Sequence, residues 1–181
     1  MIQVNSLHYN HPASGRFTRS HTLTPHDAVT IFCIVDWSNE SAVSIIEDHI
    51  LENISSTEWN IKELSQDFSY LTEHYNNFIK SFDEEEITNI KVLIAMLEWD
   101  NLTLATIGWT YGTLIEKNWS ITDISVHENK YHEFHSISSG KIANGATVYL
   151  ASGNLEQILW VEILEELSQL EPSVWIETTT N

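Results

Sequence analysis

The sequence predicts an α+β domain in which helices pack on antiparallel sheets. A continuous apolar run comes first, two long stretches with helical spacing follow it, and a series of short alternating segments comes next. Strands and helices that occur in separate blocks favour this architecture over a parallel α/β sheet. The 181 residues hold only 3 Pro and 6 Gly and contain no linker-like tract, so we expect one domain over residues 1–181.

The N-terminal half is predicted to hold strands followed by two helices. Residues 1–25 are polar and turn-rich, which indicates two short strands around a turn. Residues 28–35 are apolar and β-branched, as in a strand covered on both faces, and we expect this strand to end at Asp36. From Ser41 the apolar residues recur every three or four positions, which predicts a helix with one buried stripe. A second helix is predicted from a cap at Asn60 to Phe82.

The C-terminal half is predicted to be mostly strands, because the hydrophobic period changes to two. Residues 90–98 and 102–107 form a predicted hairpin around Asp100-Asn101. Further strands are predicted at residues 111–116, 119–124, 134–138 and 147–151, the last two separated by Asn144-Gly145. An amphipathic helix at 155–170, ended by Pro172, and a strand at 173–179 complete the order.

Composition excludes several classes of function. With 8 Lys+Arg against 26 Asp+Glu, the formal charge is −18 and the isoelectric point is about 4.6. Such a chain repels phosphate backbones, so we expect no nucleic-acid partner. A hydrophobic content of 42% and 7 Trp indicate a globular protein rather than a disordered one.

The sequence gives no sign of membrane insertion or secretion. No apolar stretch approaches the roughly 18 residues of a membrane span, and the first residues do not resemble a secretion signal. The single cysteine, Cys33, lies within the predicted buried strand, where it reads as a small hydrophobic residue rather than a nucleophile. We therefore expect a cytoplasmic protein.

Four short segments follow one another at the ends of predicted elements: Ile34-Val35-Asp36-Trp37, residues 102–115, residues 139–155 and residues 171–176. Their order and spacing resemble those of the metal-dependent serine/threonine protein phosphatases of type 2C, including the compact bacterial members. The resemblance extends over residues 28–178. It implies a β-sandwich flanked by helices, in a compact version.

The resemblance also implies a degenerate metal site. Only Asp36 of the family's acidic motifs is kept, with Trp37 in place of the glycine that follows it. Trp109, Ala146 and Gly153 stand at aspartate positions, and the final Asp-Asn pair is missing. The family's chemistry uses two divalent cations, Mn or Mg, held by carboxylates and water. One carboxylate is not expected to hold such a pair, so we expect no bound cofactor.

The positions that would line the former cleft are Asp36, Trp37, Trp109, Gly153 and Asn154. Asp36 could bind one cation together with Glu40, although we expect it to cap the following helix instead. Large aromatic side chains at Trp37 and Trp109 would fill the cleft or form an anchor surface.

His127, His132 and His135 lie close together with Glu128 and Glu133, and imidazole is a common metal ligand. Their spacing matches no closed zinc pattern, so we expect a solvated loop.

Three hypotheses of function remain. The first is a non-catalytic pseudophosphatase that binds a protein partner as a regulatory module. The second is a divergent metal-dependent phosphatase that uses Asp36, Glu40 and the histidine cluster. The third is an acidic decoy that mimics DNA, which only the net charge of −18 supports.

Overall fold

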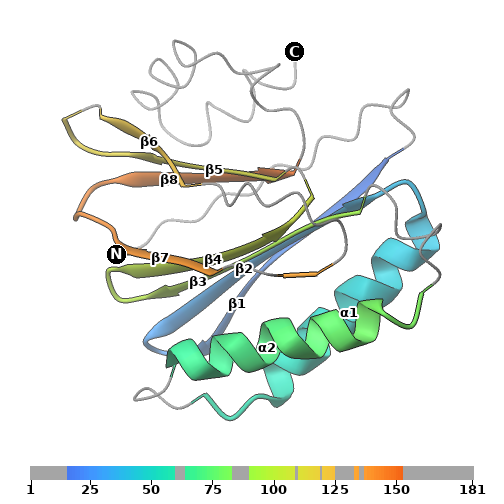
Figure 1. Cartoon of the computed structure of the whole chain (residues 1–181). Helices are drawn as coiled ribbons and strands as arrows, with labels where there is room; N and C mark the ends of the chain where they lie inside the picture. Colours follow the sequence, from blue (N-terminus) through green and yellow to red (C-terminus); the bar gives the residue numbers. More distant parts are fainter. Residues whose placement is uncertain are drawn as a thin grey trace.

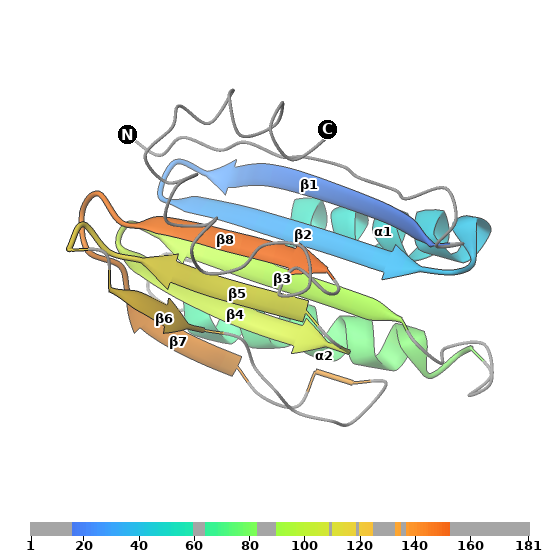
Figure 2. The ribbon, with the colours of Figure 1, turned by 90° about the horizontal axis from the view of Figure 1, so that it is seen from above.

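The computed structural model describes residues 16–59, 64–82, 90–108, 110–118, 120–124, 133–134 and 137–152. These residues form three layers, in which two helices cover one face of a five-stranded sheet and a three-stranded sheet packs on its other face (Figures 1 and 2). The predicted α+β architecture is confirmed. The predicted helix at 155–170 and the predicted strand at 173–179 lie outside the described residues.

The larger sheet is antiparallel throughout and has the strand order β1-β2-β3-β4-β7. Its strands are β1 (Phe17–His26), β2 (Val29–Trp37), β3 (Lys91–Glu98), β4 (Asn101–Ile107) and β7 (Ile137–Lys141). Residues 17–26 form one strand, and the other strand and the turn that were predicted within residues 1–25 are not tested. Residues 1–15 lie outside the described residues.

Strand β2 is covered on both faces, as its apolar run predicts. Val29, Ile31, Cys33, Val35 and Trp37 join the core on the helical side of the sheet. The alternate residues Phe32 and Ile34 pack on the core between the two sheets. The strand continues through Trp37, one residue beyond its predicted end at Asp36.

Helix α1 (Glu40–Ser56) buries one stripe against the larger sheet, as the three-to-four spacing predicts; its members are Ala42, Val43, Ile46, Ile50 and Ile54. Helix α2 (Leu64–Ile79) lies on the same face of the sheet (Figure 1). The N-cap of α1 is Asn39, whose side-chain oxygen accepts a hydrogen bond from the Ala42 amide at 3.1 Å. The predicted capping role of Asp36 is therefore wrong, because Asp36 lies within β2 and its carboxylate has other partners.

The smaller sheet has the order β6-β5-β8 and consists of β5 (Thr110–Ile115), β6 (Ile121–Asp123) and β8 (Thr147–Ser152). Leu93, Ala95, Leu102 and Leu104 of the larger sheet pack against Val148 and Leu150 of β8. The chain crosses from β4 in one sheet to β5 in the other at Gly108, which has a φ of +70°.

Two turns differ from their predictions. Glu98 pairs with Asn101, so the turn between β3 and β4 consists of Trp99-Asp100 rather than Asp100-Asn101. This register puts Leu97 opposite Leu102, and the burial of one face fixes it. Strand β7 starts at Ile137 rather than at residue 134, and it belongs to a different sheet from β8. The Asn144-Gly145 turn thus links the two sheets.

Candidate functional site

Asp36 lies at the end of the larger sheet where three strands and one strand of the smaller sheet meet. In the antiparallel registers Thr18 of β1 and Lys91 of β3 stand directly opposite Asp36. Ser152, the last residue of β8, reaches the same point from the smaller sheet. Residues far apart in the sequence thus converge on one carboxylate.

The Asp36 carboxylate is buried, and both of its oxygens accept hydrogen bonds. Its Oδ1 accepts a hydrogen bond from Nε of Arg16, and the two side chains form an ion pair. Its Oδ2 accepts hydrogen bonds from the hydroxyls of Thr18 and Ser152, both at 2.9 Å. Arg16 also donates from Nη2 to the Asp36 carbonyl oxygen at 3.2 Å. With Asp36 only 5% exposed, these contacts take most of the acceptor positions that a carboxylate has.

Two cations lie beside this single carboxylate. Burial lowers the pKa of the Lys91 ammonium, the nearby Arg16 guanidinium lowers it further, and the Asp36 carboxylate partly opposes both effects. Arg16 and Lys91 are two of only 8 Lys and Arg residues in a chain with a charge of −18. The surroundings of Asp36 are therefore locally positive in an acidic protein.

These surroundings do not fit a pair of divalent cations. Mg²⁺ and Mn²⁺ need several oxygen ligands with accessible lone pairs, and Asp36 offers a buried carboxylate already bonded to a guanidinium and two hydroxyls. Two neighbouring positive side chains would repel a divalent ion. Within the described ranges, no group of three or more His, Cys, Asp or Glu side chains could hold a metal ion.

The other predicted site residues are placed as follows. Trp37 is 2% exposed and packs edge-on against Phe82 in the helical-side core, so it offers no anchor surface. Glu40 is the exposed first residue of α1, and it is not among the hydrogen-bond partners of the Asp36 carboxylate described above. The remaining predicted positions lie outside the described residues: Trp109, Gly153, Asn154, His127, His132 and His135.

Sequence reasoning missed Arg16, Thr18, Lys91 and Ser152. One signal for Arg16 and Thr18 lay in the sequence, because both belong to the polar segment that precedes the buried strand. If that segment pairs with the buried strand as an antiparallel neighbour, its residues come to lie opposite Asp36. Nothing local connects Ser152 with Asp36, because 116 residues separate them.

Cys33 is unsuited to nucleophilic chemistry, in agreement with its predicted role. Burial raises the pKa of its thiol to about 12, and the nearby Glu47 carboxylate adds to the rise. The thiolate form that such chemistry requires is therefore suppressed.

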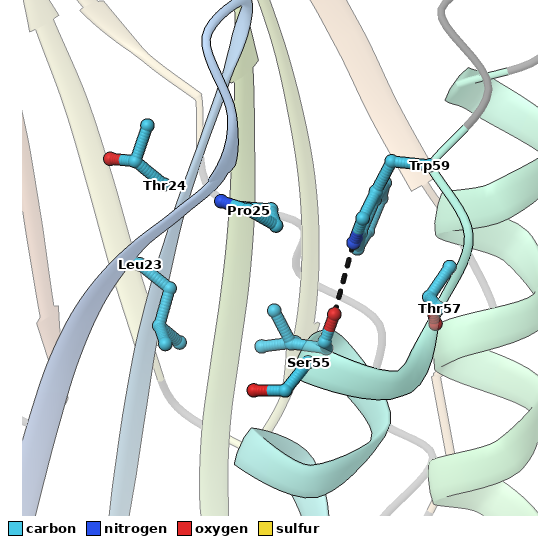
Figure 3. A pocket seen from close by; sticks show the side chains of 7 residues that line it. Leu23, Thr24, Pro25, Ser55, Thr57 and Trp59 are labelled. Carbon is cyan, nitrogen blue, oxygen red and sulfur yellow. Dashed lines mark hydrogen bonds between the residues drawn. The ribbon is translucent and has the colours of Figure 1, made fainter.

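A pocket of about 270 Å³ lies between β1 and the C-terminal end of α1 (Figure 3). Leu23, Thr24 and Pro25 line it from the strand, and Thr57 and Trp59 from the segment after the helix. The Trp59 indole N–H donates to the Ile54 carbonyl at 3.0 Å, drawn as the dashed line in Figure 3. Leu23 stands five residues along β1 from Thr18, the partner of Asp36, so the pocket is separate from the Asp36 site. None of the described residues that line it has an ionisable side chain.

None of the helices in the described part of the chain is long and apolar enough to cross a membrane. The sequence matches no protein-family model and no curated protein sequence.

Solved structures nevertheless share the fold. The serine/threonine phosphatase of S. agalactiae is 10% identical, with a TM-score of 0.66 over 98% of this chain and 88% of that one. PppA of Pseudomonas aeruginosa, described as a key regulatory component of T6SS, is 9% identical, with a TM-score of 0.61 over 91% of this chain and 89% of that one.

The serine/threonine phosphatase PstP/Ppp of Mycobacterium tuberculosis is 10% identical, with a TM-score of 0.57 over 89% of this chain and 88% of that one. A further structure, of the PstP catalytic domain with two manganese ions, has a TM-score of 0.53 at 10% identity, over 91% of this chain and 88% of that one. The chain has the fold of the type 2C serine/threonine phosphatases.

Proposed function

We propose that this chain is a non-catalytic, type 2C phosphatase-like domain that acts as a protein-binding or regulatory module. One observation carries the proposal: the only aspartate kept from the acidic motifs, Asp36, is buried and bonded to Arg16, Thr18 and Ser152. A carboxylate in that state has little capacity left for a divalent cation. The sequence supports the same conclusion, because Trp109, Ala146 and Gly153 stand where the family has aspartates.

The proposal includes no catalytic manganese or magnesium. The PstP structure with two manganese ions illustrates the cation pair that the fold can carry in another protein. Such cations polarise the phosphoryl group and lower the pKa of a bound water, and both effects need a metal held in place by several ligands. Without those ligands, hydrolysis of a phosphate ester would lose its main source of rate acceleration.

A phosphatase assay tests the absence of catalysis. We expect no hydrolysis of para-nitrophenyl phosphate or of a phosphoserine peptide above the buffer rate, with Mn²⁺, with Mg²⁺ or with EDTA. An active type 2C phosphatase serves as the positive control. The proposal is wrong if wild-type protein shows metal-dependent turnover that Asp36→Ala abolishes, and the divergent metal-dependent phosphatase would then be the better hypothesis.

An exposed tryptophan supports the protein-binding part of the proposal. Trp99 is 72% exposed in the turn between β3 and β4, and its φ of 54° is a left-handed conformation that large side chains rarely adopt. Exposed Trp residues are enriched among the side chains that dominate protein–protein binding. Backbone strain also tends to occur where function requires it.

Trp99 lies far from the Asp36 site. Lys91 stands opposite Asp36 at one end of β3, and Glu98, next to Trp99, is at the other end. They are seven positions apart along an extended strand, which is about 23 Å. Binding through Trp99 would therefore use a surface other than the former cleft.

Matched variants test this surface. In cross-linking followed by mass spectrometry, we expect partner proteins captured by wild-type protein to be lost with Trp99→Gly, since glycine fits the left-handed turn without strain. Ile45→Ser is the control, because Ile45 is also exposed, at 52%, but lies on α1. Equal capture by wild-type protein and Trp99→Gly would contradict the assignment of binding to Trp99.

A further inference from the structure

The Asp36 carboxylate is buried and has a positive partner. It is 5% exposed, and a buried carboxylate without compensation is strongly destabilising. Arg16 supplies this partner with a charge-assisted hydrogen bond to Oδ1 and a second contact to the carbonyl oxygen of the same residue. The guanidinium thus contacts Asp36 at both its side chain and its main chain.

The same carboxylate links three strands from both sheets. Arg16 directly precedes β1, Thr18 lies on β1, and Asp36 lies on β2 of the larger sheet. Ser152 belongs to β8 of the smaller sheet and donates to Oδ2 at 2.9 Å. A charge fixed on Asp36 therefore holds the end of the smaller sheet to the larger one.

We infer that Arg16 takes the place of a bound cation in this domain: it neutralises the buried Asp36 carboxylate and so maintains the polar link between the two sheets without metal. The inference goes beyond the proposed function, because it concerns what stabilises the fold and does not depend on whether the protein turns over a substrate. Lys91 contributes a second positive charge at the same point, which further disfavours a divalent ion there.

Thermal unfolding of single and double variants tests the role of Arg16. Arg16→Met is expected to lower Tm by roughly 5–15 °C, the range for a buried carboxylate that loses its hydrogen-bonded ion-pair partner in a domain of this size. In the double variant Arg16→Met/Asp36→Asn the buried charge is gone, so its loss in Tm should be clearly smaller than the sum of the two single losses. Arg19→Met is the matched control, since Arg19 lies exposed on β1, three residues after Arg16, and its Tm should change by less than about 2 °C.

A milder variant keeps the test informative if Arg16→Met does not fold. Arg16→Lys retains the charge but lacks the Nε–H and the fork geometry, so its Tm should lie below that of wild-type protein and remain measurable. An Arg16→Lys variant that is no more stable than Arg16→Met would overturn the inference, because the retained charge would then contribute nothing. So would equal stability of the Arg16→Met and Arg19→Met variants, or additive losses in the double variant.

The metal arm of the experiment uses Mn²⁺ and EDTA. A ligand that binds only the folded state raises Tm. Since we infer that no metal ion binds at Asp36, the Tm of wild-type protein is expected to shift by less than about 1 °C with either Mn²⁺ or EDTA. A rise in Tm with Mn²⁺ that Asp36→Asn removes would overturn the inference. Phosphatase turnover without any such shift would instead count against the proposed function alone.

Discussion

The crossing between the two sheets depends on a glycine, Gly108, and the loss of stability in Gly108→Ala should measure this dependence. Gly108 has a φ of +70°, and a Cβ added there would lie 2.5 Å from the carbonyl oxygen of Ile90 and 3.2 Å from Cγ of Lys91. The left-handed conformation costs a residue with a Cβ about 1–2 kcal/mol. Overpacking against a backbone atom adds about 1–3 kcal/mol. The reduced entropy of the unfolded chain returns about 0.4–1 kcal/mol.

The net expectation for Gly108→Ala is a loss of about 1–4.6 kcal/mol in the free energy of unfolding, or roughly 2–18 °C in Tm. Urea and thermal unfolding, followed by tryptophan fluorescence and circular dichroism, measure both quantities. Gly140→Ala is the matched control: Gly140 lies in β7, an added Cβ would meet no atom within 4 Å, and its φ is not in the left-handed range. We expect Gly140→Ala to be neutral or to stabilise by up to about 1 kcal/mol. Equal stabilities of the two variants would refute the reasoning.

Three further predictions concern other parts of the molecule. Trp99→Gly should change stability by less than about 1 kcal/mol, because relief of the left-handed strain offsets the lost packing and the extra chain entropy, and a larger loss in urea unfolding would mean that Trp99 is structural. Asn76→Ala should lower the free energy of unfolding by about 2 kcal/mol, because the Asn76 side chain donates to the Phe134 carbonyl at 3.0 Å and accepts from the Phe134 amide at 2.8 Å. An unchanged urea midpoint would show that these two hydrogen bonds are dispensable. Burial lowers the pKa of His49, whose ring stacks on Phe78, so the unfolded chain takes up a proton first as pH falls below about 6.5 and stability should fall there. This fall between pH 7.5 and 5.5 should be smaller in His49→Phe, and equal falls in urea unfolding would contradict the assignment.

Much of the fold could be predicted because its signals are local. The apolar run at 28–35 and the stripe through Val43, Ile46 and Ile50 require only the periods of a strand and a helix, and both elements are found. The predictions were wrong where the structure depends on contacts between residues that are not close in the sequence pattern. The turn between β3 and β4 was placed one residue late, because its position follows from the pairing of Leu97 with Leu102 rather than from the Asp-Asn dipeptide.

The candidate site was predicted less completely than the fold. Asp36 was singled out as the retained acid, and its carboxylate was assigned to a helix cap that Asn39 forms instead. Trp37 was expected at a cleft, yet the alternation of side chains along β2 directs it to the helical side of the sheet with Cys33 and Val35. Both errors concern side-chain direction, which depends on where β2 ends.

The residues alone establish an acidic, globular α+β chain with one strand buried on both faces. These are properties of composition and of patterns within about twenty positions. The environment of Asp36 has a different origin, because its partners come from β1, from β8 and from the residue before β1, at separations of 18 to 116 residues. Strand register and the packing of two sheets bring these groups together, and only the assembled fold pairs the aspartate with an arginine.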